Sequence, residues 1–218
     1  MGYAIAIDGP AGAGKSTIAK NIAGKLGFVY VDTGAMYRAM AVFVNDLGID
    51  PADEKKVVES ICNADISIEY IDGAQQVILN GVNVTGRLRL EETGKSASLV
   101  SKYLPVREKL VELQRRLASK TNVVMDGRDI ATAVLPNADV KVYLTASSDT
   151  RAQRRVKELL EKGEKADFDR IKADIEARDY QDMHREHSPL VQAEDAVLVD
   201  SSNMTIEEVT DTIIDLTK

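Results

Sequence analysis

Short apolar segments recur along the chain and predict buried β-strands. They are Tyr3–Ile7, Phe28–Val31, Val123–Met125, Val140–Leu144 and Ala196–Val199. The residues between these segments follow helical spacing instead, as where Ile18, Ile22 and Leu26 recur every four residues. Strands that alternate with helices build a parallel sheet covered on both faces. We therefore predict an α/β fold with a five-stranded parallel sheet and flanking helices.

Three helices have recognisable boundaries in the sequence. One is expected from about 35 to 47, since Gly48 is a typical residue at a helix carboxyl end. Another begins at Pro105, with Val106, Leu110, Leu113 and Leu117 as its buried face. A closing helix runs to about 217, because Thr205 and Glu208 have the spacing of a capping box.

Two stretches depart from this alternation and are interpreted as insertions. Residues 66–85 alternate at period two, and Asn80-Gly81 is suited to a two-residue hairpin turn, so a small antiparallel sheet is expected there. Residues 151–185 are rich in charge, and Gly163 divides them into two helices. Composition alone favours a solvated helical hairpin for this second stretch.

Length and charge narrow the function classes. The chain of 218 residues suffices for one α/β unit with insertions. Its formal charge of −7 argues against nucleic-acid and membrane surfaces as partners, and favours small molecules. The single cysteine, Cys62, is interpreted as a packing residue, and no targeting segment is recognised. We expect a monomer located in the cytoplasm.

A glycine-rich segment follows the first predicted strand and opens the first helix. Its sequence, Gly9-Pro-Ala-Gly-Ala-Gly-Lys15-Ser16, has the spacing of a phosphate-binding P-loop. Glycines let backbone N–H groups converge on phosphates, Lys15 reaches the terminal phosphates, and the Ser16 hydroxyl suits Mg²⁺. The segment predicts a nucleoside triphosphate site, and the alternative is a glycine-rich turn that binds nothing.

Two further motifs follow predicted strands, at the sheet edge where ligands bind in doubly wound folds. They are Asp32-Thr-Gly-Ala-Met-Tyr-Arg38 and Asp126-Gly-Arg-Asp129. With the P-loop, the β-rich stretch, Arg151-Ala-Gln-Arg-Arg155 and Arg178-Asp-Tyr-Gln-Asp182, they make the chain resemble bacterial-type cytidylate kinases of the nucleoside-monophosphate kinase family. The resemblance covers essentially the whole chain.

The resemblance implies a P-loop kinase core, a monophosphate-binding region and a mobile helical lid within one cytidylate-kinase-like unit over 1–218. On this basis the core covers about 1–32, 120–150 and 186–218. The monophosphate-binding region covers about 33–119, including the β insertion 66–85, and the lid covers about 151–185. The implied reaction transfers a phosphoryl group from ATP to CMP or dCMP, with Mg²⁺ as cofactor.

The resemblance also assigns residues to each substrate. Those expected to bind ATP are Gly9, Pro10, Ala11, Gly12, Ala13, Gly14, Lys15, Ser16, Thr17 and Arg154. Those expected to bind CMP are Thr33, Arg38, Ser98, Arg107, Arg128, Asp129, Arg178, Asp182 and Arg185. Lys15, Arg128 and Arg185 are the expected catalytic residues, and Ser16 is the expected Mg²⁺ ligand, partly through water.

Asp129 carries the most specific expectation of this set. A carboxylate accepts a hydrogen bond from the cytosine amino group but cannot donate one to the uracil O4. Ser98 and Arg107 are the other base-reading positions that the resemblance implies. Thr33 stands where the family commonly has serine, and it retains the hydroxyl.

Several of the arginines have a plainer alternative. Ile171, Ile175, Arg178, Asp182 and Arg185 are three or four residues apart, so they form one stripe of a single predicted helix. Its polar end is either a ligand site or a surface ion network of little energetic weight. Arg107 is alternatively an exposed residue beside the buried helix face, and Arg154 and Arg155 are alternatively solvated charges.

The expected mechanism needs no general base, because the attacking phosphate oxygen of CMP is already ionised. Two other functions stay open from the sequence: a P-loop kinase for another small acceptor, and a non-catalytic ATP-sensing module. The DGRD and RDYQD matches count against the first. The intact Lys15, Ser16 and arginine set count against the second.

Overall fold

The computed structural model describes residues 2–218 and divides into two compact units. Unit 1 consists of Met1–Tyr30 with Thr121–Lys218, and unit 2 consists of Val31–Lys120. Each unit is described separately below.

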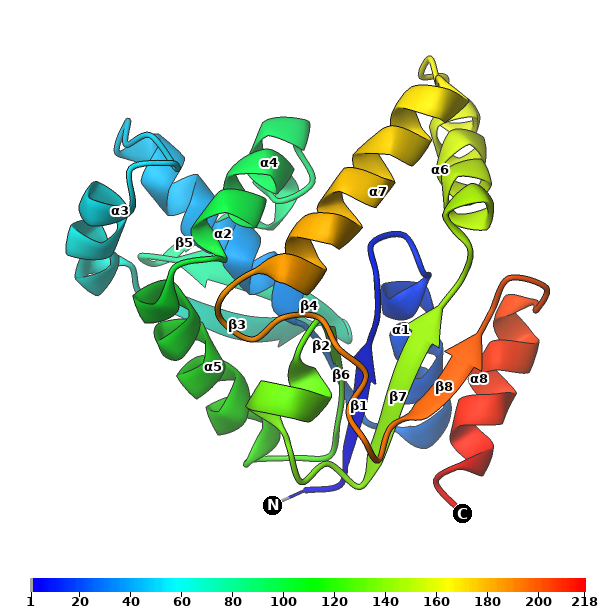
Figure 1. The fold of residues 1–218 in the computed structure, drawn as a ribbon. Helices are drawn as coiled ribbons and strands as arrows, with labels where there is room; N and C mark the ends of the chain where they lie inside the picture. The colour runs from blue at the N-terminus through cyan, green and yellow to red at the C-terminus, as the bar shows by residue number, and fades with distance from the viewer. Residues whose placement is uncertain (1) are drawn as a thin grey trace. The chain divides into compact units, whose positions relative to one another are not determined.

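A five-stranded sheet organises unit 1, which contains all of it except the last two residues of β2 (Figure 1). Its strands follow the order β2-β6-β1-β7-β8. β1 pairs in parallel with β6 and β7, and β7 pairs in parallel with β8. The strands span β1 Ala4–Asp8, β2 Val29–Asp32, β6 Val123–Gly127, β7 Val140–Thr145 and β8 Val197–Asp200. The five-stranded sheet predicted from the apolar segments is confirmed.

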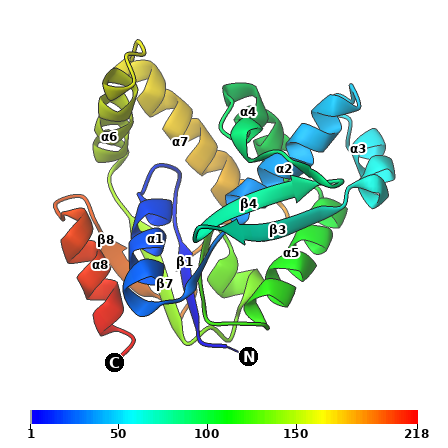
Figure 2. The ribbon, with the colours of Figure 1, turned by 180° about the vertical axis from the view of Figure 1, so that it is seen from behind.

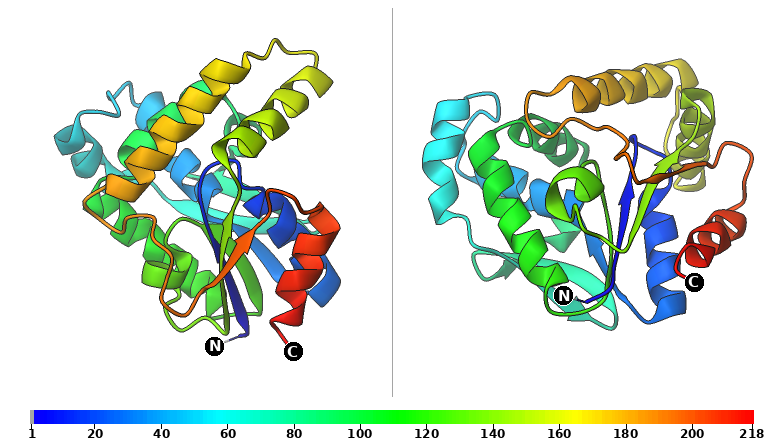
Figure 3. Two further views of the ribbon diagram at one scale, coloured as in Figure 1. Left: turned by 45° about the vertical axis from the view of Figure 1, so that its right-hand side comes forward. Right: turned by 60° about the horizontal axis from the view of Figure 1, so that its bottom comes forward.

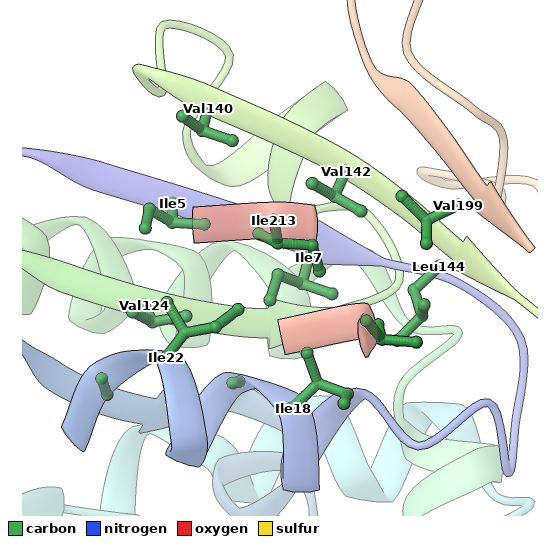
Figure 4. Packing of buried hydrophobic residues seen from close by; sticks show 13 residues of the cluster. Ile5, Ile7, Ile18, Ile22, Val124, Val140, Val142, Leu144, Val199 and Ile213 are labelled. Atoms are coloured by element: carbon green, nitrogen blue, oxygen red, sulfur yellow. The ribbon is translucent and has the colours of Figure 1, made fainter. Parts of the chain in front are cut away.

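The core of unit 1 lies between this sheet and the helices α1 (Lys15–Leu26) and α8 (Ile206–Asp215). Figure 4 shows Ile5 and Ile7 of β1 beside Ile18 and Ile22 of α1, with Ile213 of α8 in the same cluster. All five residues of β1 are buried, as expected for a central parallel strand covered on both faces. This packing fixes the position at which β1 ends and the P-loop begins.

The charged stretch folds as a helical hairpin in unit 1, with α6 over Ser148–Glu161 and α7 over Phe168–His184 (Figure 3). Gly163 follows α6 with φ of 75°, a left-handed conformation that favours glycine. Arg185 lies just after α7 with extended backbone angles. The prediction that Arg185 continues the helical stripe was therefore wrong, because the helix ends one residue earlier.

The remaining elements of unit 1 agree with their sequence signals. The capping box of α8 is present, with reciprocal hydrogen bonds between Thr205 and Glu208. A short helical turn of π type, η3 over Ile130–Val134, follows β6. No sequence pattern indicated this turn.

Unit 2 combines helices with a three-stranded antiparallel sheet, seen from behind in Figure 2. The strands are β3 Ile66–Ile71, β4 Ala74–Leu79 and β5 Val82–Asn83. The helices are α2 Thr33–Asp46, α3 Glu54–Ser60, α4 Glu91–Val100 and α5 Leu104–Ala118, with short turns η1 Ile61–Asn63 and η2 Thr85–Arg87. The predicted antiparallel insertion is confirmed.

Both hairpin turns of this sheet consist of two residues with positive φ. Asn80 and Gly81 both have positive φ, 49° and 79°, as a two-residue turn of this kind requires. Asp72 and Gly73 have φ of 51° and 74° and join β3 to β4 in the same way, a turn that the sequence analysis did not single out.

One prediction about unit 2 was wrong. Cys62 lies on the η1 turn and is exposed, so it is not a packing residue. Ile61, its neighbour, takes the buried position of that turn. Within residues 2–218, no helix is long and apolar enough to span a bilayer.

Candidate functional site

The P-loop follows β1 in unit 1. The backbone geometry explains why two of its positions, Gly9 and Gly14, are glycine. A Cβ atom added to Gly9 would lie 1.9 Å from the Leu144 carbonyl oxygen, so no other residue fits between β1 and β7 at this point. Gly14 precedes α1 with φ of 88° and contributes no capping side chain. The amino end of α1 thus presents backbone N–H groups and a partial positive charge to an anion.

Lys15 is the first residue of α1, and its ammonium group is folded back onto the loop. Nζ donates to the carbonyl oxygens of Gly9 and Pro10, each at 2.7 Å. Burial and the nearby Arg128 charge hold the pKa of Lys15 well below its usual range. Phosphate anions would favour the charged form of this buried amine, which makes Lys15 suited to a polyanionic ligand.

Ser16 is connected to a carboxylate that the sequence analysis did not assign. Its hydroxyl donates to Asp126 Oδ2 at 3.0 Å, and Tyr30 donates its phenol proton to Asp126 Oδ1 at 2.8 Å. Asp126 is buried near the end of β6, the strand next to β1. Its place at the carboxyl end of an adjacent parallel strand was the sequence signal that could have identified it.

Arg128 and Asp182 form a nearly buried ion pair, although they are distant in sequence. Arg128 Nε lies 2.7 Å from Asp182 Oδ2. Burial opposes the charge on each group, yet the pairing dominates: the pKa of Arg128 is raised and that of Asp182 is lowered. The pair joins the loop after β6 to the last turn of α7, so the Arg128 guanidinium is held in place by a residue 54 positions away.

Arg185 and Asp129 form a second contact between the same two segments. Arg185 Nη2 lies 3.5 Å from Asp129 Oδ1, and both side chains are buried. Arg185 Nε also donates to the Ser188 carbonyl at 2.7 Å, in a turn where Ser188 has φ of 49°. Unit 1 therefore brings Arg128, Asp129, Asp182 and Arg185 together.

Asp8 ends β1 and organises the loop that carries Asp129. Its two carboxylate oxygens accept from the backbone N–H groups of Ile130 and Ala131, each at 2.8 Å. Asp8 is buried, and this burial raises its pKa to about 6 although the two N–H groups act in the opposite direction. The sequence analysis missed Asp8, since nothing local connects it to residues more than a hundred positions away.

We expect the stability contributed by Asp8 to depend on pH. Its pKa is raised on folding, so this contribution is full below about pH 4 and is lost as pH rises through about 6. The free energy of unfolding of the wild type, relative to Asp8→Asn, should fall by about 2–3 kcal/mol between pH 4 and pH 7. Urea unfolding of both proteins across this range measures the difference, and a constant difference would contradict the prediction.

Unit 2 contains the other residues assigned to CMP. Thr33 is the buried first residue of α2, and Asp32 caps that helix by accepting from the Ala35 N–H at 2.9 Å. Arg38 lies about one turn further along the helix, and its guanidinium passes close to Gly34. A Cβ atom added to Gly34 would lie 3.4 Å from Arg38 Nη1. Ser98 is half-buried on α4.

The burial of Arg107 differs from that expected of a helix-surface arginine. It is only 2 % exposed on α5, so the alternative of an exposed residue beside the buried face is wrong. Its Nη1 donates to the Ser101 carbonyl at 3.1 Å, and the guanidinium lies 5.6 Å from the Tyr37 ring centre. These contacts and the cation–π attraction to Tyr37 stabilise a buried cation on a face that also buries Gln114.

The arginines of the hairpin have distinct surroundings. Arg154 donates to the Ser201 carbonyl at 2.6 Å and is half-buried. Arg155 pairs with Glu158 at 2.8 Å on the exposed face of α6, as an ordinary solvated charge would. Arg178 is half-buried on α7, one turn before Asp182.

Metal binding can be judged from the donor atoms. Residues 2–218 contain no cluster of three His, Cys, Asp or Glu side chains able to form a protein-only metal site. The Ser16 hydroxyl and the Asp126 carboxylate are instead a pair of hard oxygen donors next to the phosphate-binding loop. Mg²⁺ is commonly held by one or two such groups together with substrate phosphates, so these residues fit it.

Comparisons with known proteins agree across the whole chain. A family model described as "Cytidylate kinase" matches residues 5–218. A cytidylate kinase of Caldicellulosiruptor bescii is 50% identical over 212 residues, covering 97% of this chain and 94% of its own length. One of Shouchella clausii is 48% identical over 217 residues, covering 100% and 96%.

The fold is also similar to that of a solved protein from Eubacterium ventriosum described as uncharacterized. The TM-score is 0.54 at 12% identity, with 98% of this chain and 96% of the other chain covered. At this identity the similarity concerns the fold alone.

Proposed function

The chain belongs to the cytidylate kinase family, and we propose that the residues described above catalyse phosphoryl transfer from ATP to CMP and dCMP. The observation that carries the residue assignment is the arrangement at the end of the sheet in unit 1. There the adjacent strands β1 and β6 lead directly into the P-loop and into the loop of Arg128 and Asp129. The relatives' names favour a kinase over a non-catalytic sensing module.

The ATP phosphates are assigned to the P-loop, Gly9 to Thr17. Its backbone N–H groups and the amino end of α1 bind the phosphate oxygens, and Lys15 leaves its two carbonyl partners to reach the terminal phosphates. Arg154 is assigned to ATP as well. Its present partner, Ser201, follows β8 at the same edge of the sheet.

The residues proposed to bind CMP are those that the family resemblance implies. In unit 1, Arg128 and Arg185 bind phosphate as planar guanidinium groups, Asp129 accepts from the cytosine amino group, and Arg178 with Asp182 binds the sugar. In unit 2, the assigned residues are Thr33, Arg38, Ser98 and Arg107. Arg128 now pairs with Asp182, and Arg185 contacts Asp129. To bind phosphate, each guanidinium must share these contacts with substrate oxygens or exchange them for substrate oxygens.

The transfer itself requires alignment and neutralisation of charge. The CMP phosphate oxygen that attacks is already ionised, so no side chain has to remove a proton. Lys15, Arg128 and Arg185 offset the negative charge on the transferring group and hold it in line between donor and acceptor. Exclusion of water prevents hydrolysis of ATP in place of transfer.

Mg²⁺ is the proposed cofactor, with Ser16 and Asp126 as the residues that hold it, partly through water. When bound, the ion neutralises phosphate charge. Ser16 and Asp126 already lie within hydrogen-bond distance of each other, so the protein contributes preorganised oxygen donors.

Several features stay predictions in this proposal. The helical hairpin α6–α7 is the proposed lid over residues 151–185. The region of about 33–119 is proposed to bind the monophosphate. A monomer in the cytoplasm is likewise proposed.

A panel of acceptors tests the function. With ATP and Mg²⁺, we expect coupled turnover with CMP and dCMP, little with UMP, and equal amounts of ADP and CDP formed. Turnover confined to AMP, GMP or a hydroxylated acceptor would instead indicate another P-loop kinase. Nucleotide binding with no transfer to any acceptor would indicate a sensing module.

A further inference from the structure

An ion pair at the base of the α6–α7 hairpin is not explained by the assignments above. Arg151 in the first turn of α6 and Asp179 in α7 are 6 % and 8 % exposed, and Arg151 Nη1 lies 2.6 Å from Asp179 Oδ2. Removing two charges from water is costly, so such a pair persists only when further hydrogen bonds satisfy both groups.

Those further hydrogen bonds are made with the P-loop. Asp179 Oδ1 accepts from the Ala11 N–H at 3.1 Å, and Arg151 Nη1 donates to the Ala11 carbonyl oxygen at 2.8 Å. Arg151 Nε donates to the Ala146 carbonyl at 2.9 Å, which ties the guanidinium to the segment after β7. In Figure 1 that segment lies next to the loop between β1 and α1. Both backbone polar groups of Ala11 are thus held by one ion pair.

Holding Ala11 at both groups fixes two peptide planes of the phosphate-binding loop, because peptide units are planar and trans. The Ala11 N–H shares its plane with the Pro10 carbonyl, which accepts from Lys15 Nζ at 2.7 Å. The Ala11 carbonyl shares its plane with the Gly12 N–H and points away from it. The ion pair therefore sets the direction of one loop N–H and of one Lys15 partner.

A steric contact supports the same conclusion. Gly12 has φ of 77°, and a Cβ added to it would lie 3.4 Å from Arg151 Cβ. The loop backbone thus passes directly against the stem of Arg151, so loop shape and hairpin base are packed together as well as hydrogen-bonded.

We propose that Arg151 and Asp179 are positioning residues that hold the P-loop in the shape that binds the ATP phosphates. The inference rests on the proposed ATP site and assigns neither residue a contact with substrate. It also places a fixed point at the base of the hairpin, which narrows the moving part of the proposed 151–185 lid to the residues between Arg151 and Asp179.

Conservative variants test the proposal. Arg151→Lys keeps the charge but loses the fork that serves three acceptors. Asp179→Asn keeps the shape but replaces one carboxylate oxygen with an NH₂ group. The remaining amide oxygen can accept from Ala11 or from Arg151, and the NH₂ group then faces the other donor. We expect the affinity for Mg·ADP, measured by calorimetry, to fall about tenfold or more in each variant. The affinity for CMP, measured alone, should change much less.

Lys172→Met is the matched control. Lys172 pairs with Asp149 at 2.9 Å and also joins α7 to α6, but on the exposed face. It should bind Mg·ADP as the wild type does. The proposal is overturned if folded Arg151 and Asp179 variants retain Mg·ADP affinity, or lose ADP and CMP affinity by the same factor. Failure of the wild type itself to bind Mg·ADP would instead contradict the proposed ATP site.

A measurement on the wild type keeps the test decisive if both variants unfold. The Ala11 amide donates to a buried carboxylate, so its hydrogen exchange in the nucleotide-free protein should be slow for a loop position. Exchange as fast as that of an unstructured amide would show that the contact is not formed in solution and would refute the proposal.

Discussion

Lys15→Ala should lower kcat for CMP phosphorylation by at least about 10²–10³-fold, the loss typical of one preorganised charge aimed at a transition state. The Lys15 side chain is already buried before nucleotide binds, and its Nζ is held by two loop carbonyls. Little reorganisation is then needed when negative charge on the transferring phosphoryl group approaches it. Initial rates in a coupled assay at saturating ATP and CMP measure the effect.

The fold should survive this substitution. Lys15 donates to two loop carbonyls, but its removal also relieves the cost of a buried cation. Lys25→Ala is the matched control, since Lys25 lies on the same helix and pairs with Asp211 at the surface. We expect this control to retain turnover. A folded Lys15→Ala protein with turnover close to the wild type would disprove the assigned role.

Asp129→Asn should narrow the preference for CMP over UMP. In the proposed site the wild-type carboxylate would accept from the cytosine amino group and would face an unfavourable acceptor in uracil, a difference of roughly 1–3 kcal/mol for a good base-edge contact. The asparagine amide offers a donor to the uracil O4. The value of kcat/KM for CMP should therefore fall, while that for UMP falls less or rises. Measuring both values in both proteins gives the change in selectivity.

The contact between Asp129 and Arg185 provides the competing explanation. If Asp129 only holds Arg185, at 3.5 Å, the substitution should lower kcat/KM for both substrates by a similar factor. Arg185→Gln separates the two explanations, because it removes the partner and keeps the carboxylate. It should lower both rates and leave the CMP preference in place. An unchanged CMP/UMP ratio in Asp129→Asn would mean that Asp129 does not read the base.

The sequence determined the parts of this protein that depend on neighbouring residues. Apolar runs such as Val140–Leu144 and helical repeats such as Ile18 and Ile22 predicted how strands and helices alternate along the chain. Asn80-Gly81 predicted a turn, and the P-loop spacing predicted a glycine-rich loop between β1 and α1, whose phosphate site stays a prediction. These signals act over a few residues, through backbone geometry and side-chain periodicity, so they can be read before the chain is folded.

Tertiary structure alone decided which charges meet and which side chains are buried. Asp8 accepts from N–H groups 122 and 123 residues away, and Arg151 reaches Ala11 across 140 residues. Cys62 is exposed and Arg107 is buried, each against the expectation from its local pattern. Burial and ion pairing depend on the groups that surround a side chain in space. Those groups come together only when the strands pair and the helices pack, and no local spacing encodes their identity.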